Sequence, residues 1–281
     1  YTFSHPQTRF YNIASRLGAR RHFSRNAVQV LDFFAGLVAR RLEEGRRPLL
    51  IAKKAFLATC AEQVQRRLYE WGARDARVVT SDDLGAVDLN AAGVVPLINY
   101  GMIGTNLFES FDAAYCLTSY YVGEKELDQV LQDVTPSDLQ IELKIRMDGR
   151  PLRRRVEVVD ADDRFYDVAG LAPHALAELE MGVVLQAVGR VRPFTRPREV
   201  ILFQANEPRV SYAAEFATLD QARRHFGIPT GRERDAARTA VQVALAQAEG
   251  LTQRETADRI GVSERTVQRY WSRRSTTRHE P

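Results

Sequence analysis

Two absences narrow the class of protein before any motif is considered. The 281 residues include only two cysteines, Cys60 and Cys116, and they do not form a CxxC pair. This predicts buried thiols in a reducing compartment and argues against a disulfide framework; since no other cluster has metal-ligand spacing, we expect no bound metal. No apolar run approaches the roughly 20 residues of a membrane-spanning helix, and residues 1–6 lack the pattern of a signal peptide. We therefore expect a cytoplasmic protein without a membrane partner.

Charge of either sign is not in large excess. The chain has 40 basic and 36 acidic residues, a formal net charge of +4, so the distribution of charge is more informative than its total. Its 44% of hydrophobic residues is ordinary for a globular chain, and its length suffices for one sizeable core plus an accessory module. The sequence starts without Met, so we expect a further part upstream.

Short apolar runs alternate with amphipathic helices through the first 205 residues. This order is typical of a parallel sheet covered by helices on both faces, and it predicts an α/β fold. The predicted elements are a helix over 24–44 capped by Ser24, a strand over 49–52, a helix over 56–71 that buries Leu57, Cys60, Val64 and Leu68, strands over 77–80, 94–99 and 113–118, a helix over 124–132, and a last strand over 198–204. Functional loops of such sheets follow the carboxyl ends of strands, which is where residues 101–106 fall.

A glutamine, a glycine and two arginines stand at the end of a predicted helix, in the segment 186–194 (QAVGRVRPF). The guanidinium groups of Arg190 and Arg192 are planar and always charged, so they meet the charge of a phosphoryl group better than lysine does. This pattern favours a phosphate-binding function. The alternative is a solvated helix end whose arginines complement the helix dipole.

Three segments together resemble the last three motifs of superfamily-two helicases of the DEAD/DEAH type. They are the strand and lysines of 48–54, the strand and glycine loop of 96–106, and the segment 186–194. The resemblance covers about residues 45 to 205 and implies the second, carboxyl-terminal RecA-like domain of such an enzyme. It implies that Arg190, supported by Arg192, stabilises transition-state charge on ATP, and that Gln186 helps to position the nucleotide. The further cofactor-binding residues that it implies are Gly104, Thr105, Asn106 and Gly189.

The first half of such an enzyme is not found in the sequence. No G-x-x-x-x-G-K-[S/T] phosphate loop occurs, and neither Asp82-Asp83 nor Asp162-Asp163 ends an apolar strand as a magnesium-binding motif should. ATP and Mg²⁺ are therefore expected only with a phosphate-loop domain, upstream in the same polypeptide or in another subunit. The family's sixth motif also ends in an arginine where this chain has Pro193. Either Arg192 serves in its place, or Arg190 alone contacts the nucleotide.

An insertion over 139–159 alternates apolar and polar residues on both sides of Asp148-Gly149, which is a strong hairpin signal. The strand after the turn carries Arg150 and the run 153–155 of arginines. This predicts either a basic face laid along a nucleic-acid backbone or an edge hairpin protected from aggregation by its charges.

The segment 251–271 resembles the helix-turn-helix of resolvase and sigma-factor type domains. Ala257 is small where two helices would cross, Gly261 permits the tight turn, and the shared core is predicted to comprise Ile260, Val262, Val267 and Tyr270. Ser263 is expected to cap the second helix. A helix presented to the major groove reads adenine with Gln and guanine with Arg. The DNA-binding residues expected on this basis are Ser263, Glu264, Arg265, Gln268, Arg269, Arg273 and Arg274. The alternative is a helical hairpin for protein docking.

The predicted organisation has four parts: a connecting segment and packing helix (1–45), the RecA-like domain (46–205), a linker (206–230) and the helix-turn-helix domain (231–281). Two functions fit it. The first is the carboxyl-terminal portion of an ATP-dependent DNA helicase or translocase that cannot hydrolyse ATP alone. The second is a non-catalytic DNA-binding regulator of replication or of a mobile element, in which the sheet domain is a degenerate scaffold.

Overall fold

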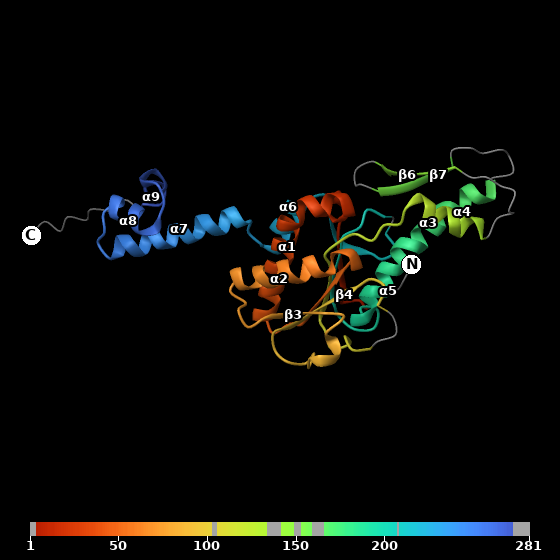
Figure 1. The fold of residues 1–281 in the computed structure, drawn as a ribbon, viewed down its shortest axis with the longest axis horizontal. Coiled ribbons are helices and arrows are strands. Elements are labelled where there is room, and N and C mark those ends of the chain that lie inside the picture. Colours follow the sequence, from red (N-terminus) through yellow and green to blue (C-terminus); the bar gives the residue numbers. More distant parts are fainter. Residues whose placement is uncertain are drawn as a thin grey trace, which may run out of the picture. The chain divides into compact units, whose positions relative to one another are not determined.

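The structure is a computed structural model. It describes residues 4–102, 106–133, 142–148, 153–158, 166–206 and 208–271. The chain divides into two compact units, Tyr1–Ile228 and Pro229–Pro281. The larger unit is built on a parallel sheet, and the smaller one is helical (Figure 1).

The sheet of the large unit has seven strands in the order β3-β4-β2-β5-β8-β1-β9, and every pairing within it is parallel. This confirms the predicted α/β class with a parallel sheet and is consistent with a RecA-like layout. The strands are β1 (Arg9–Ile13), β2 (Pro48–Ala52), β3 (Arg77–Thr80), β4 (Val94–Asn99), β5 (Ala113–Cys116), β8 (Glu199–Leu202) and β9 (Tyr212–Phe216). All residues of β2, β5 and β8 are buried, because central parallel strands are covered on both faces.

Helices cover both faces of the sheet. The connections from β1 to β2 and from β2 to β3 run in one direction across the sheet, so right-handed crossovers place α1 (Arg20–Glu43) and α2 (Leu57–Glu70) on the same face. Figure 1 shows these two helices side by side, and α6 (Leu219–Phe226) also contacts α1. The connection from β5 to β8 runs in the opposite direction and places α5 (Val183–Val188) on the other face.

Several local predictions are confirmed and one helix start is corrected. The four residues predicted to face the core from α2 are buried, and Cys60 and Cys116 are free, buried thiols whose pKa values burial raises to about 12. The first helix begins at Arg20, not at Ser24. The Ser24 hydroxyl lies within the helix and donates to the Arg20 carbonyl at 3.1 Å.

The sheet extends past its expected bounds at both ends of the large unit. Strand β1 lies in 1–45, where only a connecting segment and a helix were expected. Strand β9 lies in the expected linker 206–230, so the prediction that 198–204 holds the last strand is wrong. Asn12 joins these elements because its buried amide donates to Gln204 O at 3.0 Å and to Glu215 Oε2 at 2.9 Å.

The expected hairpin is part of a larger insertion with its own small core. β6 (Leu143–Asp148) and β7 (Arg153–Val158) pair antiparallel and pack with α3 (Glu124–Gln132) and α4 (Tyr166–Ala177). Residues 139–141 and the turn at 149–152 lie outside the described residues. Buried apolar side chains of the insertion form a separate cluster: Leu127, Leu131, Leu143, Ala172 and Leu176.

Two arginines of β7 do not match the prediction of a nucleic-acid-facing surface. Arg154 forms an ion pair with the fully buried Glu180, and its guanidinium lies 4.6 Å from the centre of the Tyr121 ring. Arg153 forms an ion pair with Glu215 at 2.8 Å. Both guanidinium groups are drawn inward because carboxylates of neighbouring elements need a buried or half-buried cation as partner.

The small unit consists of α7 (Gly231–Ala248), α8 (Gln253–Ile260) and α9 (Glu264–Tyr270), which pack on one another. Val243, Ala257 and Val267 form its buried core, with Ile260, Val262, Tyr270 and Trp271 packed against them. Gly261 ends α8 with a φ of 69°, a conformation that favours glycine and turns the chain into α9.

Candidate functional site

In the large unit, the arginine-bearing segment 186–192 contacts the loop after β4. Arg190 lies on the 3-10 turn Gly189–Val191 that follows α5, and its Nη2 donates to Met102 O at 2.9 Å. Met102 belongs to the loop after β4, so one guanidinium links the end of a helix to the loop that the sequence singles out.

Arg192 reaches the same loop from the next turn of the chain. Its Nη2 lies 2.8 Å from Asn106 Oδ1 and 2.7 Å from Glu109 Oε1. The hydrogen bond from Arg192 is the main cause that lowers the pKa of the Glu109 carboxyl. Both side chains are partly exposed, at 44% and 33%, so another anion can reach the guanidinium and compete with Glu109.

The backbone at Arg192 is unusual. With a φ of 59° and a ψ of 47° it is the one non-glycine residue at positive φ among those that the structure describes. Such a conformation is uncommon for a residue with a Cβ and is found more often at functional sites. It directs the chain into Pro193, the position at which the predicted helicase resemblance expects an arginine. Arg192 contacts the loop through Asn106 and Glu109.

The other predicted nucleotide-site residues are placed unevenly. Gln186 is exposed on α5, and a Cβ at Gly189 would meet no atom within 4 Å, so packing does not require glycine there. Gly104 and Thr105 lie outside the described residues. Glu109 is a residue that sequence reasoning missed, since nothing in its surroundings signals that it pairs with an arginine 83 positions away.

Lys53 follows β2 at the carboxyl edge of the sheet, close to the point where the strand order reverses. Its Nζ donates to Tyr121 O at 2.9 Å and lies 5.3 Å from the centre of the Tyr120 ring. Burial is the main cause that lowers the pKa of this ammonium. Ligands bind in this region of doubly wound sheets, and the two tyrosines are contacts that the sequence did not predict.

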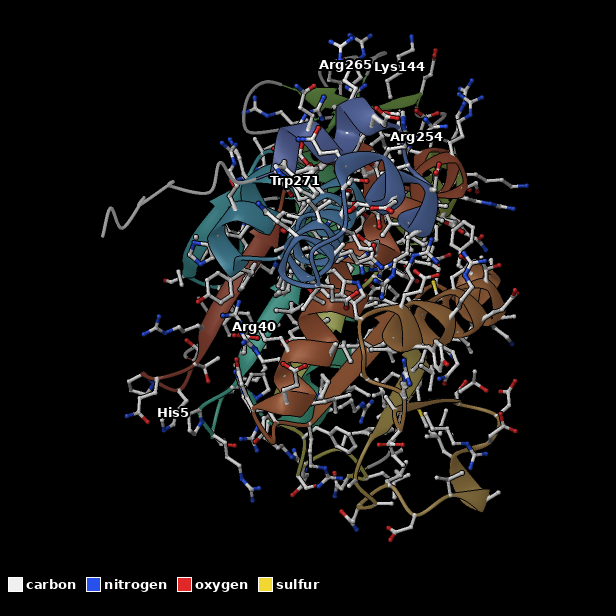
Figure 2. All side chains as sticks on the ribbon, turned by 90° about the vertical axis from the view of Figure 1, so that its left-hand side faces the viewer. His5, Arg40, Lys144, Arg254, Arg265 and Trp271 are labelled. Carbon is white, nitrogen blue, oxygen red and sulfur yellow. The ribbon has the colours of Figure 1, made fainter. Side chains whose placement is uncertain are left out.

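The second group of predicted residues lies on α9. The Ser263 hydroxyl accepts from Thr266 N at 3.2 Å and caps the helix, while Val267 is buried against the unit's core. The side chains left exposed on α9 are Glu264, Arg265, Gln268 and Arg269. Arg265 extends away from the ribbon (Figure 2). Arg273 and Arg274 lie outside the described residues.

Within the described ranges, no group of three His, Cys, Asp or Glu side chains is arranged to hold a metal ion. In the same part of the chain, no helix combines the length and the apolar character that crossing a bilayer requires.

Comparison with known proteins identifies one region. Residues 215–280 match the family model of ECF sigma factors. The sigma-factor-like segment begins in β9 and contains α6, α7, α8 and α9, so the carboxyl-terminal part of the chain is similar to these proteins. No curated protein and no solved structure matches the chain. The helicase resemblance of the large unit therefore stays a prediction.

Proposed function

We propose that the chain is a DNA-binding protein with a regulatory role, in which α8 and α9 form a helix-turn-helix and α9 enters the major groove. The observation that carries this proposal is the two-sided character of α9. Val267 anchors the helix to the core, and Arg265, Gln268 and Arg269 are exposed together on it. Arginine and glutamine are the side chains that read base edges by paired hydrogen bonds. The similarity to sigma factors over residues 215–280 supports the same function.

The test starts with a duplex selected from random sequences by binding to the full chain. Replacing Gln268 or Arg265 by Ala is expected to weaken binding by about 1–3 kcal/mol if the side chain reads a base. If Arg265 instead contacts a phosphate, affinity falls for all sequences alike and the salt slope decreases by about one. Arg25→Ala, an exposed arginine on α1, is the matched control and should bind as the wild type does. Wild-type affinity in all the α9 variants would exclude this mode of binding.

A second proposal concerns the large unit. We infer that it is the carboxyl-terminal RecA-like half of an ATP-dependent DNA helicase or translocase, and that the small unit guides it to DNA. Supporting this is the meeting of Arg190 and Arg192 with the loop after β4, through Met102 O and Asn106 Oδ1. One segment thus brings two arginines to a loop that is distant in the sequence, and positioned arginines are what the arginine side of a nucleotide cleft requires.

The residues present fit part of an ATP site. Arg190 and Arg192 would hold phosphoryl oxygens, because their donors suit phosphate and the Glu109 partner of Arg192 is exposed enough to be displaced. In such a cleft, ATP supplies the phosphoryl group whose transfer to water drives the motor. The described residues include no carboxylate cluster for Mg²⁺, so the magnesium ligands would belong to the phosphate-loop partner.

This second proposal is tested in a complex that contains the phosphate-loop domain. Arg190→Ala should lower the rate of ATP hydrolysis by about 10³ to 10⁵, as loss of an arginine finger does, and leave DNA affinity unchanged. Arg25→Ala is again the control for a lost surface charge. Hydrolysis near the wild-type rate in Arg190→Ala would exclude the arginine-finger role. DNA binding with no nucleotide dependence in any complex would instead favour the non-catalytic regulator.

A further inference from the structure

A second cationic site lies at the edge of the sheet opposite to the carboxyl ends of its strands. A cavity of about 510 Å³ opens where β1 and β8 begin, beneath the last turn of α1 and the end of α6. The register pairs Arg9 with Glu199, so the first residues of these two neighbouring strands lie side by side. The volume lies within the range of small-molecule sites.

The charges that line this cavity are unbalanced. Five arginines line it, and the carboxylates among its described lining residues are Glu44 and Glu199. The five are Arg9, Arg40, Arg41, Arg46 and Arg198. An excess of positive charge in a concave surface concentrates field lines and attracts anions.

Two of these arginines are held in place by several hydrogen bonds within the protein. Arg41 donates to Glu199 through Nε at 3.0 Å and Nη2 at 2.9 Å, and its Nη1 reaches Glu44 at 3.0 Å. Arg198 donates to three backbone carbonyls, among them Val191 O at 2.6 Å. We therefore assign both of these side chains to the framework of the cavity.

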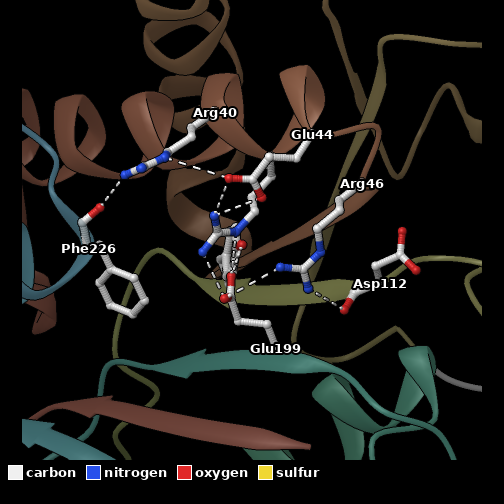
Figure 3. A network of polar contacts seen from close by, with 8 residues as sticks. Arg40, Glu44, Arg46, Asp112, Glu199 and Phe226 are labelled. Atoms are coloured by element: carbon white, nitrogen blue, oxygen red, sulfur yellow. Dashed lines mark hydrogen bonds and ion pairs between the residues drawn. The ribbon is translucent and has the colours of Figure 1, made fainter.

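The other three retain unused donors. The Arg9 side chain has no hydrogen bond or ion pair with any residue that the structure describes. Among the described residues, the Arg46 side chain makes only long contacts, 3.6 Å to Glu199 and 3.4 Å to the Asp112 carbonyl (Figure 3). Arg40 donates one Nη1 bond to Phe226 O at 2.8 Å and is otherwise 3.6 Å from Glu44.

We propose that this cavity binds a small ligand carrying a diphosphate or triphosphate group, held by Arg9, Arg40 and Arg46. A guanidinium presents several donors in a planar fork that matches phosphate oxygens, and charge-assisted bonds of this kind are roughly twice as strong as neutral ones. Several adjoining phosphoryl groups suit three guanidiniums better than one phosphate does. Arg46 and Arg198 contact the later part of the loop after β4, at the Asp112 and Glu109 carbonyls, whereas Arg190 contacts its beginning at Met102 O. The proposal for the cavity does not depend on the function proposed for that loop.

The test is a calorimetric titration of the full chain with inorganic triphosphate at low ionic strength. We expect saturable binding of one ligand per chain, and each of Arg9→Gln and Arg46→Gln should weaken it about tenfold, the loss of one charge-assisted contact. The Arg9 side chain is exposed and has no partner in the described part of the chain, so its replacement should leave the fold intact. Arg25→Gln on α1 is the matched control and should titrate as the wild type does.

Two further arms separate this cavity from other phosphate binders. Arg190→Ala should retain triphosphate binding; loss of binding in Arg190→Ala but not in Arg9→Gln would overturn the proposal and assign the ligand to the loop. A single-stranded oligonucleotide serves as the second probe. The proposal would also be overturned if triphosphate does not bind saturably while the oligonucleotide binds and Arg9→Gln weakens that binding. The ligand would then be a nucleic-acid backbone.

Discussion

Glu199 begins β8 and accepts two hydrogen bonds from Arg41 as well as one from the hydroxyl of Tyr115. Burial alone would raise the pKa of this carboxyl, but the hydrogen bonds from Arg41 and Tyr115 outweigh burial, so its pKa lies below the usual value. Glu199→Gln removes the charge and leaves the mostly buried Arg41 with Glu44 as its one remaining carboxylate partner among the described residues. We expect the free energy of unfolding at pH 7 to fall by about 3 kcal/mol, measured by urea denaturation.

The same pair makes a prediction about pH. A carboxyl whose pKa is depressed in the folded state stabilises the fold above its unfolded pKa of about 4.3, and that contribution is lost as pH falls through the folded pKa. The difference in unfolding free energy between wild type and Glu199→Gln should therefore shrink below about pH 4.3. A difference that stays constant from pH 7 down to acid unfolding would contradict the assigned pKa direction.

The arginines show why the placement of single residues can be predicted only in part from sequence. The segment 186–192 places glutamine, glycine and arginine at one helix end, and in the structure Arg190 and Arg192 contact the loop after β4. The arginines of β7 carried an equally basic signal. Arg154 is nevertheless drawn inward by Glu180, whose burial depends on elements that the sequence does not place.

At the scale of elements, α1 packs closely against α2 through Gly36. A Cβ built at Gly36 would lie 2.5 Å from the nearest ring atom of Trp71, at the end of α2. Gly36→Ala should therefore lower the free energy of unfolding by about 1–3 kcal/mol through overpacking, despite the better helix propensity of alanine. Thermal unfolding followed by circular dichroism measures this change.

A helical glycine with free space is the matched control for Gly36. Gly170 lies in α4, and a Cβ there would meet no atom within 4 Å. Gly170→Ala should leave stability unchanged or raise it by up to about 1 kcal/mol, because only the helix-propensity term remains. If both variants lose stability equally, the close approach of Trp71 to Gly36 is not the cause.

Elements with a clear apolar pattern were predictable, and β1 was not. Helix α3 has the predicted bounds of 124–132, and β3 and β4 also match, because their apolar residues have a clear period and end at turn residues. Strand β1 was missed because five residues that include Asn12 give a weak strand signal. Its pairing with β8 and β9, from the far end of the unit's sequence, determines its structure.

At the scale of the whole molecule, the candidate sites differ in how much of them sequence could reveal. The exposed face of α9 was predictable because the spacing of apolar residues within one short segment indicates which residues face the core. The cavity lined by Arg9, Arg40 and Arg46 was not, because these arginines come from separate elements whose proximity follows from the strand order. A pattern within one segment of the sequence does not reveal contacts between segments that are far apart in the chain.

The small unit has its own core, and this leads to the final prediction. Val243, Ala257 and Val267 form its hydrophobic cluster, so Val267→Ala removes a large share of that core. We expect the free energy of opening of α7, α8 and α9 to fall by about 1–3 kcal/mol, with no change in α1 or β8. Hydrogen exchange read by mass spectrometry measures both sets of peptides in one experiment.

The matched control for Val267→Ala is Leu245→Ala in the same unit, since Leu245 is 59% exposed and its truncation leaves no cavity. Leu245→Ala should leave exchange unchanged in every peptide. Val267→Ala should also weaken DNA binding, because α9 presents Arg265 and Gln268 only while it is docked on this core. If Val267→Ala also speeds exchange in α1 and β8, the two units unfold cooperatively. If its DNA affinity is unchanged although α9 exchanges faster, the DNA contacts lie elsewhere on the chain.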